Sequence, residues 1–326
     1  MDSESNLRPL SIFTGYMVLA AALTVICLGT AKSSRVALTN STRAKVALFS
    51  LLAALSLGTT WYYMFEFFRW SYIDWATSQS PALGAEVYTW AGIRLGDWLR
   101  QTTLFRQAWV SVLLSPEKAW WSVQIFGFCA ILSVMVPVQG KHRNIQYTWA
   151  FILLGQIVAI SFAANLFFLA TLLHRPTVTQ TKKPSKQASD VGQLYPSSWW
   201  NSTAFWNGVV LIATLQSSLQ VTVLIQSPNF MLYLLAPHLL AFVPIILSQL
   251  IRDKTPELTL REPAWYTKLF ILITLIAQQV RAVNSAGIAW NVVWDALHQH
   301  PAVSSVGWDV ICCWVSFSLW QVLGEE

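Results

Sequence analysis

The sequence predicts an all-α protein, a polytopic transmembrane helix bundle of about eight spans, with seven as the alternative count. Hydrophobic residues make up 55% of the 326 residues and charged residues only 11%, whereas a typical soluble domain has about 25% charged residues. Apolar runs long enough to cross a bilayer core of about 30 Å recur along the chain. These observations exclude the soluble globular, disordered and collagenous classes.

The predicted spans follow one another along the whole chain. Each contains roughly 20 residues, which is the length that a helix needs to cross the hydrocarbon core. The spans cover residues 10–31, 46–68, 119–138, 148–173, 204–226, 229–251, 265–283 and 302–323. The first run is too long for the apolar part of a cleaved signal peptide, so we expect a retained helix. Residues 1–326 are therefore expected to form a single transmembrane domain.

Three connecting segments have compositions of their own. Residues 69–118 mix tryptophans with charged residues, a pattern typical of amphipathic helices at the membrane interface. Residues 175–203 contain several lysines and show no periodicity, which predicts a flexible polar linker. Residues 284–301 are semi-polar and could form a re-entrant or an interfacial helix.

Charge and motifs limit the function classes. The formal net charge is +6, but basic residues that flank apolar spans indicate a lipid bilayer as the partner, rather than nucleic acid. The four cysteines form no CxxC pair, and no HExxH, GxSxG, GxGxxG or Walker motif occurs. We therefore expect no metal and no cofactor. The eighteen tryptophans could form aromatic belts at the interfaces or line an aromatic cavity.

Two acidic residues within the predicted spans are the candidate catalytic groups. Glu66 lies near the end of the second span, and Asp309 lies inside the last span. An ionisable group in hydrocarbon costs several kcal/mol, so it usually faces the bundle interior and has a function. Apolar surroundings disfavour the charged form of a carboxyl group. Either residue could therefore stay protonated at neutral pH and act as a Brønsted acid.

Both acids also have structural alternatives. Glu66 could form an ion pair with Arg69 near the lipid headgroups. Asp309 could cap the last helix or pair with a basic residue such as Arg281. At 1.5 Å per residue the two carboxyl groups are expected to lie about 15 Å apart along the membrane normal, so they would not share one proton. The more buried position favours Asp309 as the acid.

Other polar residues are candidates for supporting roles. Asp295 lies one helical turn from His298, but no third group completes a metal site. Asn165 and Gln156 lie within a span. Amides in such positions more often form hydrogen bonds between helices than take part in catalysis.

Aromatic residues surround the two acids at helical spacing. Tyr62, Glu66 and Trp70 are four residues apart and share one helix face. The candidate substrate-lining residues are Trp61, Tyr62, Tyr63, Trp70 and Trp314. An acid beside aromatic rings is suited to carbocation cyclisation, because the acid protonates an epoxide or alkene and the π faces stabilise the cation. A dry apolar cavity keeps water from quenching that cation.

Several stretches resemble fungal integral membrane terpene cyclases of meroterpenoid biosynthesis, of the ascofuranone and macrophorin type. They are WYYMFEFFRWSYIDWA, LGDWLRQTTLFRQAW, WWSVQIF, LLGQIVAISFAANLFFLATLL and HPAVSSVGWDVICCW. The resemblance implies a metal-free, atypical type II cyclase acting on a farnesylated aromatic compound, often after a separate oxygenase has made a terminal epoxide. Smaller fungal cyclases pair a Glu in the second span with an Asp in the last, which matches Glu66 and Asp309. Those proteins have seven spans, whereas this chain is predicted to have eight.

The expected function is thus a membrane-embedded terpene cyclase that protonates a prenylated aromatic substrate and guides its cyclisation. We expect it in the endoplasmic reticulum, in association with other membrane enzymes of the pathway. The alternatives are a transporter of small molecules or lipids, indicated by glutamines and prolines in the spans, and a non-catalytic membrane scaffold, indicated by the long segment 69–118.

Overall fold

The computed structural model describes residues 7–32, 39–79, 94–174, 203–250 and 264–324, and these residues are helical with no strand. The first helices are α1 (Leu7–Lys32), α2 (Asn40–Gln79), α4 (Leu95–Gln101), α5 (Leu104–Leu113), α6 (Pro116–Ser122) and α7 (Gln124–His142). They are followed by α8 (Thr148–Ile157), α9 (Ile160–Leu173), α10 (Thr203–Val221), α11 (Phe230–Leu240), α12 (Val243–Leu250), α14 (Trp265–Ser285), α15 (Trp290–Gln299) and α16 (Pro301–Leu323). The all-α prediction is confirmed for this part of the chain.

The number of spans differs from the prediction of about eight. Among the described residues, five helical segments are long and apolar enough to cross a membrane: α1, α2, α6 with α7, α14 and α16. The count is six if α11 and α12, which are bent by 44° at the break between them, form one broken span. These apolar helices are what an integral membrane protein requires.

The predicted span 148–173 is wrong, because this segment forms two short helices. The helical backbone is interrupted at Val158 and Ala159, where Ala159 is extended with φ −166° and ψ 138°. At 1.5 Å per residue, α8 and α9 are roughly 15 and 21 Å long. Neither helix is long enough to cross a core of about 30 Å.

The helices α8 and α9 run antiparallel, as a re-entrant hairpin. The rings of Phe151 and Phe167, which lie at equal distances in sequence from the interruption, are 5.4 Å apart. At the outer end of the hairpin, Arg143 after α7 donates from Nη1 to the carbonyl oxygens of Thr171 and His174, each at 3.0 Å. Both outer ends of the hairpin therefore lie at the same end of the bundle, and the interruption forms its inner tip.

A glycine permits the close packing of this hairpin. A Cβ atom on Gly155 would lie 3.2 Å from the side chain of Ile160 and 3.4 Å from that of Ala163. The first distance is shorter than most van der Waals contacts, so a larger residue at this position would require the side chain of Ile160 to shift.

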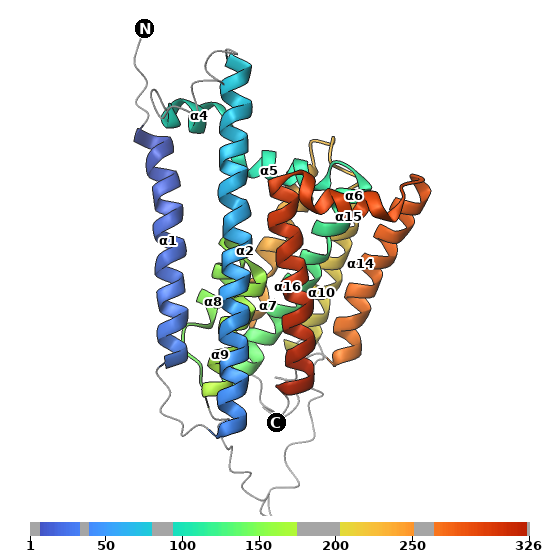
Figure 1. Cartoon of the computed structure of the whole chain (residues 1–326). Helices are drawn as coiled ribbons and strands as arrows, with labels where there is room; N and C mark the ends of the chain where they lie inside the picture. The colour runs from blue at the N-terminus through green and yellow to red at the C-terminus, as the bar shows by residue number, and fades with distance from the viewer. Residues whose placement is uncertain (1–6, 33–38, 80–93, 175–202, 251–263, 325–326) are drawn as a thin grey trace, which may run out of the picture.

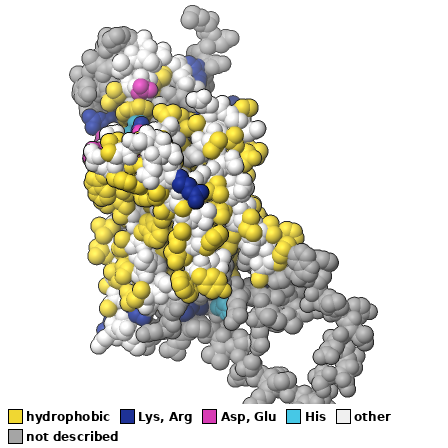
Figure 2. All heavy atoms as spheres, turned by 90° about the vertical axis from the view of Figure 1, so that its right-hand side faces the viewer, with side chains coloured by type: hydrophobic (Ala, Val, Ile, Leu, Met, Phe, Trp, Pro, Cys, Tyr) yellow, Lys and Arg dark blue, Asp and Glu magenta, His cyan; other side chains and the backbone are white. Residues whose placement is uncertain are grey.

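The hairpin is enclosed by long helices. Within the segment formed by α6 and α7, an apolar stretch of 18 residues is completely buried in the bundle, and α9 packs against α1, α2 and α16. This enclosure matters because non-helical backbone at membrane depth is tolerated only where protein or a water-filled cavity surrounds it. Figure 2 shows hydrophobic side chains over the middle of one outer face of the bundle, as a lipid-facing surface requires.

Short helices gather at the end of the bundle that holds α15 (Figure 1). Of the segment 69–118, residues 69–79 continue α2 in a helix of 40 residues, and residues 94–118 form α4, α5 and the start of α6. Residues 80–93 lie outside the described residues, as does the predicted linker 175–203 apart from Thr203, where α10 begins. In the segment 284–301, α15 lies across the end of the bundle and does not form a re-entrant helix.

Candidate functional site

Asp309 caps the second helix of the re-entrant hairpin. Its side chain is buried, and its Oδ2 and Oδ1 atoms accept hydrogen bonds from the backbone N–H groups of Ile160 and Ser161, at 2.9 and 2.8 Å. These are the first two residues of α9, whose N–H groups have no partner within the helix. A carboxylate also interacts favourably with the positive end of the helix dipole. Asp309 thus caps a helix, as one of the alternatives predicted, but the helix is α9 and not α16. The other alternative is not found, because the described residues show no ion pair between Asp309 and Arg281.

Tyr16 binds the other side of the same tip. Its hydroxyl group on α1 donates to the carbonyl oxygen of Ile157, the last residue of α8, at 2.6 Å, and lies 3.5 Å from the Sδ atom of Met64. The last carbonyl groups of a helix have no partner within it. The hairpin tip is therefore held at both of its helix ends, by one side chain from α1 and one from α16.

Gln156 ties the tip to two further helices. Its Nε2 atom donates to the Sγ atom of Cys129 on α7 at 3.2 Å, and its Oε1 atom lies 2.6 Å from Nδ1 of His238 on α11. The ring of His238 packs edge-on against Trp109 and Phe126, with centroids 5.6 and 5.9 Å apart. Gln156 thus acts as an amide that forms hydrogen bonds between helices, one of the two roles considered from the sequence.

Asn165 has the same kind of role one turn along α9. Its Nδ2 atom donates to the Oγ atom of Ser316 on α16 and to the carbonyl oxygen of Ser161, both at 2.9 Å. Together, Tyr16, Gln156, Asn165 and Asp309 form what we call the hairpin clamp. These four side chains connect a short re-entrant element to the long helices around it.

The Tyr16→Phe variant is expected to be less stable than the wild type. The substitution keeps the ring and removes the hydroxyl group, so the partly buried carbonyl group of Ile157 loses its partner. A fully buried polar group that is left unsatisfied costs about 1–3 kcal/mol, so the loss at this partly buried carbonyl group should be smaller. Thermal unfolding of the purified protein in detergent should show a lower midpoint, whereas Tyr266→Phe at an exposed position of α14 should not. Equal midpoints for the two variants would contradict a structural role for Tyr16.

Glu66 lies in a different place, in a cavity of about 340 Å³ that we call the Glu66 pocket. Its walls come from α2, α15 and α16, and the lining residues are Tyr62, Tyr63, Glu66, Arg69, Trp70, Ile73, His298, Pro301 and Ser304. The prediction that Tyr62, Glu66 and Trp70 share one helix face is confirmed by this arrangement. Tyr63, a further candidate substrate-lining residue, also lines the pocket.

Glu66 forms the ion pair that the sequence offered as its alternative role. Its Oε2 atom lies 3.5 Å from Nη1 of Arg69, and the two side chains are 39% and 58% exposed. An exposed pair of this kind typically contributes only about 0–1 kcal/mol. The carboxyl group is therefore only weakly bound, and it remains available to a molecule that enters the pocket.

The other predicted site residues lie elsewhere. Trp61 does not line the pocket, and its indole nitrogen is buried without a partner. Trp314 donates to Oε1 of Gln124 at 2.8 Å and lines a separate cavity of about 320 Å³. Asp295 is exposed on α15, whereas its neighbour His298 lines the Glu66 pocket.

From the sequence we expected a buried carboxyl group and an aromatic-lined pocket to occur at one site, whereas the structure places them apart. Asp309 is buried, but it lines neither the Glu66 pocket, nor the cavity beside Trp314, nor a larger one next to Tyr16. Glu66 lines an aromatic pocket, but its carboxyl group is partly exposed and paired. Sequence reasoning missed Tyr16 and His238 as partners of the hairpin, since neither lies near a recognisable motif.

His300 packs on one wall of the Glu66 pocket and is expected to make stability depend on pH. Its ring lies 4.4 Å from that of Trp70. Burial, with a smaller contribution from the positive charge of Lys118, lowers the pKa of His300 to about 4 from its ordinary 6.5. As the pH falls, His300 is protonated in the unfolded chain before it is protonated in the folded protein, and this favours unfolding. The contribution of neutral His300 to the stability of the fold is therefore complete above about pH 6.5 and is lost as the pH falls toward 4.

This pH dependence can be measured on a variant that keeps the cap. Nδ1 of His300 accepts from the backbone N–H of Ala302 and caps α16. Asn is also a good capping residue and does not titrate. Between pH 6.5 and 4, the unfolding midpoint of His300→Asn should fall less steeply than that of the wild type. Parallel curves would show that His300 does not contribute.

The long apolar helices and the hydrophobic outer face are compatible with one class of protein, the polytopic integral membrane proteins that form helix bundles. No family model, no curated protein and no solved structure matches the chain.

Proposed function

We propose that this protein is a membrane-embedded terpene cyclase, which protonates an epoxide or alkene of a farnesylated aromatic substrate and guides its carbocation cyclisation. The observation that carries the proposal is the grouping of one carboxyl group, Glu66, with Tyr62, Tyr63 and Trp70 around one pocket. The stretch WYYMFEFFRWSYIDWA, which contains all four residues, is also one of those that resemble the fungal cyclases.

In this proposal Glu66 is the catalytic acid. A bound apolar chain that covers the pocket displaces the water around the carboxyl group and around its exposed ion pair with Arg69. When Glu66 gives its proton to an epoxide oxygen, a C–O bond of the epoxide breaks and the oxygen becomes a hydroxyl group; when Glu66 protonates an alkene carbon, the π bond of that alkene is used. Either step leaves an electron-deficient carbon, and ring closure forms carbon–carbon bonds to it from the remaining alkene π electrons. The final cation loses a proton to the carboxylate. The product is thus an isomer of the substrate, and no oxidant or reductant takes part.

The aromatic rings and the hairpin clamp have different roles in the proposed reaction. The faces of Tyr62, Tyr63 and Trp70 stabilise the positive charge as it moves along the chain, by about 0.5–2 kcal/mol for each contact. Asp309 is a positioning residue, which joins the hairpin to α16, the helix that also contributes Pro301 and Ser304 to the pocket.

The resemblance also supports a setting for the enzyme. We propose that it resides in the endoplasmic reticulum, where other membrane enzymes of a meroterpenoid pathway would supply the farnesylated compound and its epoxide. The reaction itself needs only the substrate and the protein's own side chains.

A conversion assay tests the proposal directly. Purified protein in lipid vesicles is incubated with a farnesylated phenol or with its terminal epoxide, and the products are separated and weighed by chromatography with mass spectrometry. The cyclase proposal predicts a new compound of unchanged mass from at least one of the two substrates. Recovery of both substrates unchanged, with folded protein present, would contradict it.

A second candidate function is transport of a small molecule or lipid across the membrane. The re-entrant hairpin favours it, because short helices that end inside the bundle often form the binding sites of transporters. Sealed vesicles that take up a farnesylated phenol without changing it chemically would support transport over cyclisation. A product of unchanged mass, with no accumulation in the vesicle lumen, would support cyclisation.

A further inference from the structure

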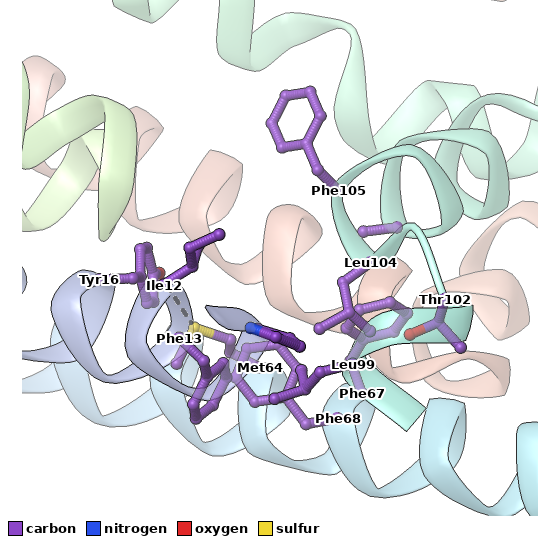
Figure 3. A pocket seen from close by; sticks show the side chains of 12 residues that line it. Ile12, Phe13, Tyr16, Met64, Phe67, Phe68, Leu99, Thr102, Leu104 and Phe105 are labelled. Atoms are coloured by element: carbon purple, nitrogen blue, oxygen red, sulfur yellow. Dashed lines mark hydrogen bonds between the residues drawn. The ribbon is translucent and has the colours of Figure 1, made fainter. Parts of the chain in front are cut away.

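A further cavity, of about 480 Å³, lies next to the hairpin tip between α1, α2, α4 and α5 (Figure 3). Its lining residues are Pro9, Ile12, Phe13, Tyr16, Met64, Phe67, Phe68, Leu99, Thr102, Leu104, Phe105 and Ala108. The volume lies within the range of about 300–1,000 Å³ that is usual for small-molecule sites. We call it the α1 cavity.

The α1 cavity is separate from the Glu66 pocket. Met64, Phe67 and Phe68 line the α1 cavity, whereas Tyr62 and Glu66 line the pocket. At 3.6 residues per turn these two sets lie on opposite faces of α2. A molecule in one site therefore does not occupy the other.

The chemistry of the lining excludes a charged or strongly polar occupant. No charged side chain lies among the described residues that line the cavity. Its two hydroxyl groups already donate hydrogen bonds within the protein, Tyr16 to Ile157 at 2.6 Å and Thr102 to Trp98 at 2.7 Å. A charged headgroup placed there would lose its hydration without gaining partners. The cavity is thus suited to a hydrocarbon chain.

The aromatic content of the walls favours an unsaturated chain. Phe13 and Phe68 pack edge to face with centroids 5.3 Å apart, and Phe67 lies 6.0 Å from Phe68. Tyr16 and Phe105 add two more rings along the cavity. Flat rings of this kind offer π faces and edges to the double bonds and methyl branches of an isoprenoid, and the thioether of Met64 adds a polarisable contact.

We propose that the α1 cavity is a second ligand site, which binds one isoprenoid chain. The choice of an isoprenoid over a fatty acyl chain rests on the proposed function, in which prenylated compounds are the substrates. The site holds the chain beside Tyr16, so a bound ligand contacts the side chain that holds the hairpin tip. Binding in this cavity does not require Glu66 and is separable from turnover.

Photo-crosslinking tests the site. The protein in lipid vesicles is mixed with a farnesol analogue that carries a diazirine group, irradiated and digested, and the labelled peptides are identified by mass spectrometry. The proposal predicts label on the lining segments of α1, α2 and α5. A diazirine fatty acid of matched length should label them at least fivefold less. Equal labelling by the two probes would identify a site for bilayer lipid and overturn the proposal, as would label spread over all lipid-facing helices.

A cavity-filling variant provides the matched comparison. Ala108→Phe places a ring in the α1 cavity, whereas Ala22→Phe makes the same change at an exposed position of α1. Labelling should be lost in the first variant and kept in the second. Retained labelling of Ala108→Phe would contradict the site.

The same probes keep this proposal distinct from the proposed function. Glu66→Gln should keep wild-type labelling of the α1 cavity, because Glu66 lies on the other face of α2. Labelling without any cyclised product would leave the site intact and contradict the cyclase. A cyclised product without labelling would support the cyclase and contradict the ligand site in the α1 cavity.

Discussion

The Asp309→Ala variant is expected to lose roughly 2–6 kcal/mol of stability, because two buried N–H groups at the start of α9 lose their acceptors at about 1–3 kcal/mol each. Those groups belong to Ile160 and Ser161 and are enclosed by protein at membrane depth. Such a loss is a large part of the total stability of about 5–15 kcal/mol that proteins commonly have. Thermal unfolding in detergent, followed by the fluorescence of the eighteen tryptophans, measures it.

Two further variants separate capping from other effects. Asp309→Asn keeps one acceptor oxygen and removes the charge. Its stability should therefore lie between that of the wild type and that of Asp309→Ala. Asp74→Ala makes the same substitution at an exposed position of α2 and should leave the unfolding midpoint unchanged. If Asp309→Ala instead unfolds like the wild type but has lost all activity, Asp309 is a catalytic acid, as the sequence favoured, and the capping account is contradicted.

The Glu66→Gln variant is expected to reduce the rate of product formation by about 10²–10⁴-fold, the usual contribution of a general acid. Glutamine keeps the size of the side chain but cannot donate the proton. Because the ion pair with Arg69 is exposed and weak, the unfolding midpoint should change little. The rate is measured by the conversion assay under conditions in which the substrate is not exhausted.

A matched variant controls for the loss of charge. Glu117→Gln removes the same charge from α6, at the end of the bundle near α15 but outside the pocket. It should keep the wild-type rate. Full activity of Glu66→Gln, or equal losses in both variants, would show that Glu66 does not provide the proton.

Local patterns were sufficient for part of this structure. The spacing of Tyr62, Glu66 and Trp70 correctly predicted one shared wall, because helix periodicity depends only on the positions themselves. Composition was sufficient to predict that the described residues form apolar helices and no strands. The ion pair of Glu66 with Arg69 was also one of the two predicted alternatives, since residues three apart face each other on a helix.

The hairpin could not be predicted in the same way. Hydropathy measures how apolar a segment is and how long, but not whether the chain turns back, and α8 and α9 together have the length of one span. Gly155 and Gln156 near the middle of that segment were the available signals, and they are weak ones. The cap on α9 comes from Asp309, which is 148 residues away from Ser161 in sequence, so only the tertiary structure brings them together.

Residues 148–173 form a re-entrant hairpin that Asp309 holds in place, and this structural role of Asp309 leaves Glu66 as the proposed catalytic acid. Cysteine labelling in sealed vesicles tests this hairpin most directly, with an impermeant maleimide and the wild type as the background. Tyr147→Cys and His174→Cys mark its two outer ends, and Ser285→Cys marks the end of α14 on the other side of the bundle. The account predicts that the first two react from the same side and the third from the opposite side. Labelling of positions 147 and 174 from opposite sides would make residues 148–173 a span and contradict it.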